Sequence, residues 1–466
     1  MRRWLAACLL LVPALGLAAP EVRLPPVYRT TLANGMRLVV AEHHELPLFA
    51  VTVFVGAGTA QDPPELLGLA QLTAETLLRG AGAWDAPALA RAVEDLGGTL
   101  DAVAGYDATI LSGDFLAEDL DAGIAILRAV LREPRLARGE VRRARDELLG
   151  QLSADLEDPS TVANQCLGAL LYGAHPYGRP PRGTPETLAE AGARDVSRFY
   201  SRWYHPNNIV ISLVGDVRAD RAIERLRAAF VDWPQRPDAV PVRSGPPAPL
   251  TGRRVLLVDK PDASQSQIRL GGVALRRADP DLLAAQVTNT ILGGGFSSIL
   301  IDELRVQRSL TYGAYSGYSA RLTGGDFRVT TSTKTDTTLA ALDLALTLTD
   351  RFRTAAPAPA ALTKAKAFVG GQFARQVETA GALAQRLAEI EFFGLPQDEL
   401  STYLTRVEAL DAARAHQVVA RVQPPTDAMA IVVLGKAAAL RAPLEAKFGP
   451  VRVVEPEACG RLAAAR

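Results

Sequence analysis

The chain has 466 residues, of which 48% are hydrophobic, 6% aromatic and 22% charged, which is typical of folded globular proteins and unlike disordered or collagen-like chains. Lysine plus arginine total 51, as do aspartate plus glutamate, so there is no general basic field that would attract nucleic acid. The cysteines Cys8, Cys166 and Cys459 form no CxxC pair, which excludes a disulfide-dense scaffold or a Cys-rich zinc module. We therefore expect two or more ordinary apolar cores and no nucleic-acid partner.

The first nineteen residues have the pattern of a secretory signal peptide. Two arginines precede the apolar stretch Trp4–Leu17, and small residues follow it. The alternative, a membrane anchor, is disfavoured because the stretch contains Pro13 and is shorter than the roughly 20 residues of a spanning helix. Residues 1–19 are predicted to be cleaved, and the mature protein is expected to be periplasmic or secreted, with no membrane association. Sequence alone does not say whether Cys166 and Cys459 are paired.

A proline-rich stretch between Trp233 and Gly252 shows neither a helical nor an alternating apolar period, which is typical of a linker. It divides the mature chain into two portions of similar length. We predict an N-terminal domain over residues 20–236, a linker over 237–252 and a C-terminal domain over 253–466.

The two portions are expected to share one fold, because a shift of 217 positions brings similar patterns together. The apolar run Arg37–Val40 falls on Arg254–Leu257, and each run suits a buried strand. Asp62-Pro63 falls on Asp279-Pro280, and each pair precedes a helix with an apolar period.

In chain order, each portion is predicted to contain a strand, a turn, a strand, two helices, a further strand and a run of helices. A tight turn at Asn34-Gly35 precedes the first strand, and a late apolar strand covers residues 209–214. Residues 431–434 repeat that late strand in the second portion. Regular βαβ alternation is absent from this order, so the predicted fold class is α+β, with two homologous α/β-layer domains.

The helix predicted over residues 67–80 follows Val55-Gly56-Ala57-Gly58 and the turn Asp62-Pro63-Pro64. This order resembles the insulinase or pitrilysin family of zinc metallopeptidases, which includes mitochondrial processing peptidase, and the resemblance covers nearly the whole mature chain. It implies two domains of the LuxS and processing-peptidase type that form half of a clam-shell. In that family the helix carries His-x-x-Glu-His, whose histidines bind zinc and whose glutamate acts as the base.

This sequence has Gln71, Ala74 and Glu75 at those three places, and Gln151 where the resemblance implies a third zinc ligand. A neutral amide is a weak zinc donor, and alanine has no group that could take a proton from water. These four positions are expected not to bind metal, and the five histidines do not rebuild a site elsewhere. A polar helix face directed toward a cleft is the simplest interpretation of Gln71 and Glu75, and the chain is expected to have no cofactor of its own.

The second portion contains Arg305 and Tyr312, seven positions apart. The resemblance implies that they match the family's arginine and tyrosine pair, which reaches the scissile carbonyl at the zinc. A guanidinium and a phenol can both donate hydrogen bonds to an oxygen that gains negative charge. The alternative is a surface arginine and a strand tyrosine that packs on its neighbour.

The run Gly293-Gly294-Gly295-Phe296 lies shortly before this pair. A phosphate-binding loop is excluded because no Gly-Lys-Ser/Thr follows it. Close approach of the backbone to another segment is the simpler interpretation. The resemblance to the non-catalytic subunit of mitochondrial processing peptidase adds a second one, in which these four residues contact a substrate peptide.

Three hypotheses about function follow. In the first, the chain is the zinc-free subunit of a periplasmic peptidase, a homologous partner binds the zinc, and Arg305 and Tyr312 act on an unfolded peptide substrate. In the second, the chain binds peptides or supports an assembly without catalysis. The third, a single-chain peptidase with an unusual metal centre at Glu75, has the least support because one carboxylate cannot hold a catalytic zinc.

Overall fold

A computed structural model describes residues 24–241 and 243–462, and the predicted signal peptide lies outside these residues. Among the described residues, the first half of the chain forms one six-stranded sheet, a hairpin of two short strands, and eight helices of four residues or more. These elements are β1 (Val27–Thr31), β2 (Arg37–Glu42), β3 (Leu48–Val55), α1 (Leu69–Leu77), β4 (Gly80–Ala81), β5 (Trp84–Asp85), α2 (Ala86–Glu94), β6 (Thr99–Ala104), β7 (Thr109–Leu116), α3 (Leu120–Arg132), α4 (Arg138–Glu157), α5 (Pro159–Tyr172), α6 (Pro185–Glu190), α7 (Ala193–Trp203), β8 (Ile209–Gly215) and α8 (Ala219–Phe230).

The second half forms a second six-stranded sheet with its own helices. Its elements are β9 (Arg254–Asp259), β10 (Ser266–Ala274), α9 (Leu282–Leu292), α10 (Ile299–Ile301), β11 (Ala314–Ala320), β12 (Gly325–Thr333), α11 (Thr338–Thr354), α12 (Pro359–Arg375), α13 (Ala380–Phe393), α14 (Tyr403–Glu408), α15 (Ala412–Val422), β13 (Ala430–Gly435), α16 (Ala437–Phe448), β14 (Arg452–Val454) and α17 (Cys459–Leu462). No helix of the described part is both long and apolar enough to cross a bilayer.

The two sheets repeat each other in five of their six strands. The first has the order β1-β2-β8-β3-β7-β6, and the second, read in the matching direction, has the order β14-β9-β13-β10-β12-β11. The outer strands differ, because β1 begins its half and is antiparallel to β2, whereas β14 ends its half and is parallel to β9. In each sheet the late strand, β8 or β13, lies parallel to one neighbour and antiparallel to the other. The prediction of an α+β chain with two homologous domains is therefore confirmed.

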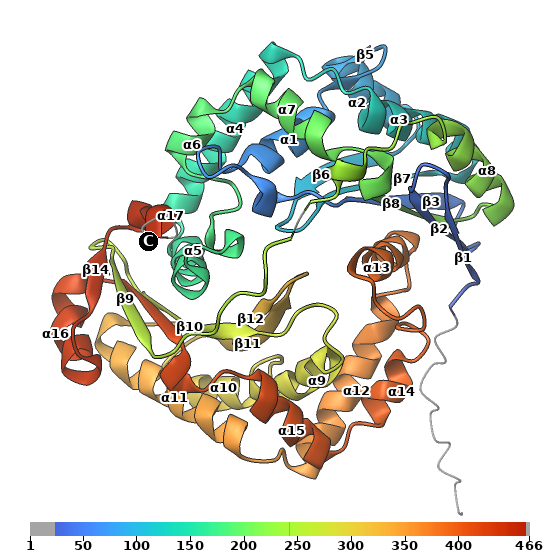
Figure 1. Cartoon of the computed structure of the whole chain (residues 1–466). Coiled ribbons are helices and arrows are strands. Elements are labelled where there is room, and N and C mark those ends of the chain that lie inside the picture. The colour runs from blue at the N-terminus through green and yellow to red at the C-terminus, as the bar shows by residue number, and fades with distance from the viewer. Residues whose placement is uncertain (1–23, 242, 463–466) are drawn as a thin grey trace, which may run out of the picture.

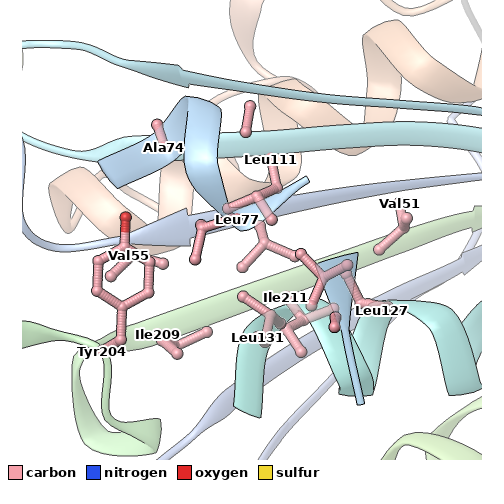
Figure 2. Packing of buried hydrophobic residues seen from close by; sticks show 14 of the residues in the cluster. Val51, Val55, Ala74, Leu77, Leu111, Leu127, Leu131, Tyr204, Ile209 and Ile211 are labelled. Carbon is pink, nitrogen blue, oxygen red and sulfur yellow. The ribbon is translucent and has the colours of Figure 1, made fainter. Parts of the chain in front are cut away.

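The core of the first half lies between its sheet and its helices, and α2, α4, α7 and α8 contribute to it as well as α1 and α3. Figure 2 shows the part of this core at α1, α3 and the strands. The strands β3 and β8 are apolar apart from one buried hydroxyl residue each, Thr52 and Ser212, because their residues are buried on both faces of the sheet. Ala74 belongs to this apolar cluster, together with Leu77 from the same helix and Leu111 from β7. The apolar side of α1 packs in this core. Gln71 and Glu75 therefore lie on the other side of the helix.

The two halves exchange equivalent helices. In Figure 1, α5 of the first half extends to the second sheet, and α13 of the second half lies against the first sheet. Helix α5 packs on β10 and β13 through Val162, Ala163 and Leu167, whereas α13 packs on β3 and β8. A shift of 217 positions superposes most of α5 on α13, so the exchange follows the internal repeat. Each half thus buries a sheet face under a helix of the other half.

A disulfide strengthens this contact between the halves. Cys166 of α5 and Cys459 of α17 form a disulfide with a Cα–Cα distance of 4.7 Å, although 293 positions separate them in sequence. Both cysteines are buried in the cluster beneath α5, with Leu256 of β9 and Val432 of β13. The sequence left the pairing of these cysteines open, and the structure pairs them.

The structure also adds strands that the sequence analysis did not identify. The turn at Asn34-Gly35 connects two strands, β1 and β2, rather than preceding the first one. The single strand predicted after the helices is the antiparallel pair β6 and β7. The described residues of the proline-rich stretch, which exclude residue 242, are irregular apart from a short turn at Pro237–Ala239.

Candidate functional site

The helix that carries the zinc-motif positions is fixed at its first turn by a buried carboxylate. Asp62 accepts hydrogen bonds from the backbone N–H groups of Gly68 and Ala70, each at 2.8 Å. Burial raises the pKa of Asp62 to about 8, although these two donors favour the charged form. Gly68 has φ +93°, and a Cβ there would lie 2.4 Å from the Arg182 carbonyl oxygen, so this position requires glycine.

Gln71 and Glu75 lie on one face of α1 and bind each other. The amide Nε2 of Gln71 donates to Oε1 of Glu75 at 3.1 Å, and its Oε1 accepts the backbone N–H of Ala104 at 2.9 Å. Glu75 lies 3.9 Å from Arg79, which also forms an ion pair with Glu147 at 2.6 Å. The side chain of Gln71 therefore ties α1 to the edge strand β6 and presents its amide group to the carboxylate.

A cavity of about 540 Å³ opens beside this face of α1. Gln71 and Glu75 line it, and so does Gln151 on α4, so three of the four positions that match the zinc motif surround one space. Ala74 is the exception, because its methyl group is fully buried in the apolar core rather than in the cavity lining. Arg321 and Arg328 from the second half complete the wall, as does the disulfide-linked Cys459.

The residues of this cavity do not fit a zinc ion. Tetrahedral zinc sites require at least three good donors, usually histidine, cysteine or carboxylate. Glu75 supplies one carboxylate, and the carbonyl oxygen of Gln71 is already bonded to Ala104. Within residues 24–241 and 243–462, no group of three or more histidine, cysteine, aspartate or glutamate side chains could hold a metal ion. The donor set of this chain therefore offers no route to a metal-activated water.

On the side of the cavity formed by the second half, the side chain of Arg321 packs against three aromatic rings. The guanidinium of Arg321 lies 4.5 Å from the ring centroid of Tyr106, 5.2 Å from that of Tyr172 and 5.1 Å from that of Tyr177. Such contacts between a cation and aromatic faces are favourable, the more so where water is excluded. Arg321 also donates to the hydroxyl of Tyr172 at 2.5 Å and to Asp326 at 3.2 Å.

Asp326 is the buried anion of this group. It accepts hydrogen bonds from Arg328 and from the hydroxyl of Tyr172, the latter at 2.6 Å. Burial alone would raise the pKa of Asp326, but Arg328 and Arg321 outweigh burial and hold the pKa below its usual value. Because Tyr172 ends α5 and Asp326 lies on β12, this ionised group joins the two halves beside the cavity.

Arg305 and Tyr312 lie outside this cavity. Arg305 is exposed in a π-helical turn, Asp302–Gln307, and Tyr312 is 82% exposed ahead of the edge strand β11. The backbone between them is unusual, because Ser309 has φ +52°, a conformation that non-glycine residues rarely adopt. Thr311 anchors the loop by hydrogen bonds to Gly313, and Tyr312 is left pointing outward. The structure thus brings the zinc-motif positions together but does not bring Arg305 or Tyr312 to them.

The glycine run has two kinds of environment. A Cβ at Gly293 would lie 2.4 Å from the backbone nitrogen of Ser316, so close approach to β11 explains that glycine. A Cβ at Gly295 would lie 3.9 Å from its nearest neighbour, the Thr290 side chain, and the adjacent Phe296 is 81% exposed. Gly294 lines a different cavity of about 940 Å³ between α9, α12 and α14.

Sequence reasoning missed the arginine-rich wall. Arg321 begins the turn between β11 and β12, and Arg328 lies within β12. Nothing in Arg321-Leu322-Thr323-Gly324 distinguishes it from an ordinary surface turn. The available signal was the pair Tyr172 and Tyr177 on either side of His175-Pro176, because clustered tyrosines often surround a cation. Pairing them with an arginine about 145 residues away required the fold.

Comparisons with known proteins agree on the family. The family model described as insulinase (peptidase family M16) matches residues 38–184, and the one described as the peptidase M16 inactive domain matches residues 191–369. A protein of Mycobacterium tuberculosis described as an uncharacterized zinc protease is 30% identical over 307 residues, which cover 64% of this chain and 68% of that protein. The match to a similarly described Mycobacterium leprae protein is 30% identical over 294 residues and spans 62% of this chain and only 65% of the relative.

Other relatives are described as inactive. The non-peptidase homolog YmxG of Helicobacter pylori is 24% identical over 379 residues, which cover 80% of this chain and 86% of that protein. A crystal structure of a peptidase M16 inactive domain from Pseudomonas fluorescens is similar with a TM-score of 0.82 and 25% identity, over 88% of this chain and 98% of that one. These names and the replaced zinc donors together support a pseudoenzyme. The chain belongs to the insulinase family of peptidases, family M16.

Proposed function

We propose that this chain is the zinc-free subunit of an exported M16 peptidase, and that Arg305 and Tyr312 act at a zinc site carried by a homologous partner. The observation that carries this proposal is the separation of the two sets of residues. The cavity with the zinc-motif positions lacks the donors for a metal, whereas Tyr312 is 82% exposed and does not line that cavity. A phenol in that position is accessible to a molecule outside this chain.

The chemistry of the pair suits that role. The guanidinium of Arg305 and the hydroxyl of Tyr312 are donors that are exposed to solvent, and both can hydrogen-bond the carbonyl oxygen of a peptide as it gains negative charge. The π-helical turn and the positive φ of Ser309 support a specialised segment, because such backbone features are frequent at functional sites. The unfolded peptide is the substrate class that an edge strand such as β11 can pair with.

Export through a cleaved N-terminal signal is part of the proposal. The disulfide between Cys166 and Cys459 supports it, because disulfides persist in the periplasm and outside the cell but are rare in the cytosol.

The test mixes the purified chain with a homologue that carries an intact His-x-x-Glu-His helix and measures cleavage of an unfolded peptide. Loss of one oxyanion donor lowers the rate by about 10²- to 10³-fold, so Tyr312→Phe should lower cleavage by that order while size-exclusion chromatography shows the same complex. Tyr28→Phe, which removes a hydroxyl from an exposed tyrosine on β1, is the matched control and should leave the rate unchanged. Equal rates for Tyr312→Phe and the unmodified chain would contradict shared catalysis.

A second candidate is a peptide-binding or assembly protein without catalysis. The observation that favours it is the engagement of Gln71 with Ala104 and Glu75, which makes the degenerate site a stable part of the fold rather than a damaged one. This function predicts peptide affinity in the isolated chain, no turnover with any zinc-bearing homologue, and binding that Tyr312→Phe does not change.

A further inference from the structure

We infer that the cavity beside α1 is a binding site for a carboxylate-bearing peptide, so that a pocket lined by metal donors in zinc-binding relatives is here an anion site. The inference concerns this chain alone. It does not rest on a zinc-bearing partner or on the role of Tyr312.

The first argument is the charge of the cavity. Four guanidinium groups line it, from Arg179, Arg182, Arg321 and Arg328, against two carboxylates, from Glu75 and Asp155. The buried carboxylate of Asp326 accepts hydrogen bonds from Arg321 and Arg328 and offsets one more positive charge. The net charge around the cavity is still positive. Glu75 is itself close to Arg79, which reduces its field in the cavity. An anion is therefore attracted, and a divalent cation is repelled.

The second argument is that the guanidinium groups have donors to offer. Arg182 uses Nη1 to bind Asp155 at 2.6 Å, Arg179 uses Nη1 to bind the Asp62 carbonyl at 3.1 Å, and Arg321 uses only Nη1 in its hydrogen bonds. Their remaining N–H groups form no hydrogen bond with a described residue. A planar guanidinium with two free N–H groups matches the two oxygens of a carboxylate, and such paired bonds are strong and directional.

The third argument concerns the rest of the lining, which suits a peptide. The cavity is also lined by Gln71, Gln151, Asn164, Gln165 and Thr161. The amides of Gln71 and Asn164 already hydrogen-bond other residues of the chain, whereas Gln151 is exposed to solvent. An amide side chain offers one acceptor and two donors, the same groups that a peptide backbone presents. A volume of about 540 Å³ is within the range of pockets that hold small ligands, so a few residues of an acidic peptide fit.

The cavity is both accessible and firmly built. Gln151 and Arg182 are exposed, and the Arg182 side chain retains 46% of its accessible surface, so a ligand can enter from solvent. The inner wall is fixed by the ionised group around Asp326 and by the disulfide at Cys459. A preformed wall reduces the ordering that a ligand would otherwise impose on the protein.

The test is binding of a fluorescein-labelled glutamate-rich peptide to the isolated chain, followed by fluorescence anisotropy at low salt. A glutamine-rich peptide of the same length is the ligand control. The acidic peptide should bind more tightly, and its affinity should fall as salt is raised. Versions with a free and an amidated C-terminus distinguish a terminal carboxylate from side-chain carboxylates.

Two substitutions at exposed Gln151 give opposite expectations without disturbing the core. Gln151→Lys should strengthen binding of the acidic peptide and Gln151→Glu should weaken it. Arg182→Gln should weaken it about ten-fold, since one charge-assisted hydrogen bond is lost. Arg218→Gln is the matched control, because Arg218 is an arginine with 78% side-chain exposure that pairs with Asp220 outside the cavity lining.

Equal affinity for the glutamate and glutamine peptides would overturn the inference, as would a shift of the same sign for both Gln151 variants. Displacement of the bound peptide by inorganic phosphate at equimolar concentration would also overturn it, because the site would then recognise any anion rather than a peptide carboxylate. Each of these outcomes is measured without a zinc-bearing homologue, so it is independent of the cleavage assay.

Discussion

The disulfide between α5 and α17 provides a quantitative prediction about the contact between the two halves. Replacing both Cys166 and Cys459 by alanine removes the covalent link but keeps α5 on the second sheet through its apolar neighbours. The double substitution avoids leaving one free thiol buried beside another. The folded arrangement should survive this change, and the stability should fall.

The magnitude follows from the length of chain that the disulfide closes. A separation of 293 residues corresponds to about 19 cal/mol/K of unfolded-chain entropy, or about 5.7 kcal/mol at 25 °C. Measured disulfides often contribute less, so we expect a loss of about 2–5 kcal/mol. An unfolding entropy of about 2.1 cal/mol/K per residue over roughly 440 residues converts this loss into a fall in Tm of about 2–5 °C.

The assay is differential scanning calorimetry with and without a phosphine reductant. Reductant should lower the Tm of the unmodified chain to that of the double variant, and it should have no effect on the double variant itself. Val162→Ala is the matched control, because it removes buried packing from the same face of α5 and leaves the disulfide intact. Its Tm should fall for packing reasons, and it should fall again when reductant is added.

Two results would refute the reasoning. If reductant leaves the Tm of the unmodified chain unchanged, the link either does not form or carries no stability. The other result is a loss of stability in the double variant together with a Tm of Val162→Ala that reductant does not change. The stability loss of the double variant would then come from altered packing around α5 and not from the missing covalent link. Protease digestion gives a second readout, because α17 should be released from the double variant first.

Two further predictions concern the interface between the halves. Arg321→Met should destabilise the chain by about 3 kcal/mol, because it leaves buried Asp326 with fewer partners, and urea denaturation measures this loss; no change in the urea midpoint would show that the ion pair is not stabilising. Burial and the nearby Arg321 lower the pKa of His175, whose Nδ1 accepts the backbone N–H of Tyr177 at 3.2 Å. The folded state therefore favours neutral histidine, and stability should fall as the pH drops through about 6.5 toward the lower folded pKa. His175→Gln should remove this acid-dependent part of the loss, and an unchanged pH profile for that variant would contradict the assignment.

The sequence was sufficient for the fold because its strongest signals are local. Strongly apolar runs such as Ile209–Val214, in which Ser212 is the one polar residue, and the similar run near the end of the second half identify buried strands without any knowledge of their partners. Strand β1 was missed for the opposite reason. Its residues are half exposed, its sequence Val27–Thr31 mixes polar and apolar types, and it lies at the edge of the sheet, so pairing with β2 rather than its own pattern stabilises it.

The site was less accessible to sequence reasoning because most of it depends on distant contacts. Gln71, Glu75 and Gln151, which helical periodicity and a family pattern single out in the sequence, line one cavity in the structure. The exchange of α5 and α13 and the pairing of Cys166 with Cys459 depend on the arrangement of the two halves. No local pattern encodes which sheet a helix will cover when both sheets offer similar apolar faces.

The exchange of helices gives the replaced zinc motif a physical context. Because α5 lies on the second sheet, its last residue, Tyr172, brings the arginine-bearing turn of the second half to the cavity beside α1. Two guanidinium groups of the second half, Arg321 and Arg328, thus share a space with Gln71 and Glu75 of the first. Positive charge in the same cavity opposes the binding of a divalent cation, and partial burial strengthens that repulsion. The neutral amide on α1 and the arginines across from it are therefore consistent with each other, and the same charge that opposes zinc attracts a carboxylate.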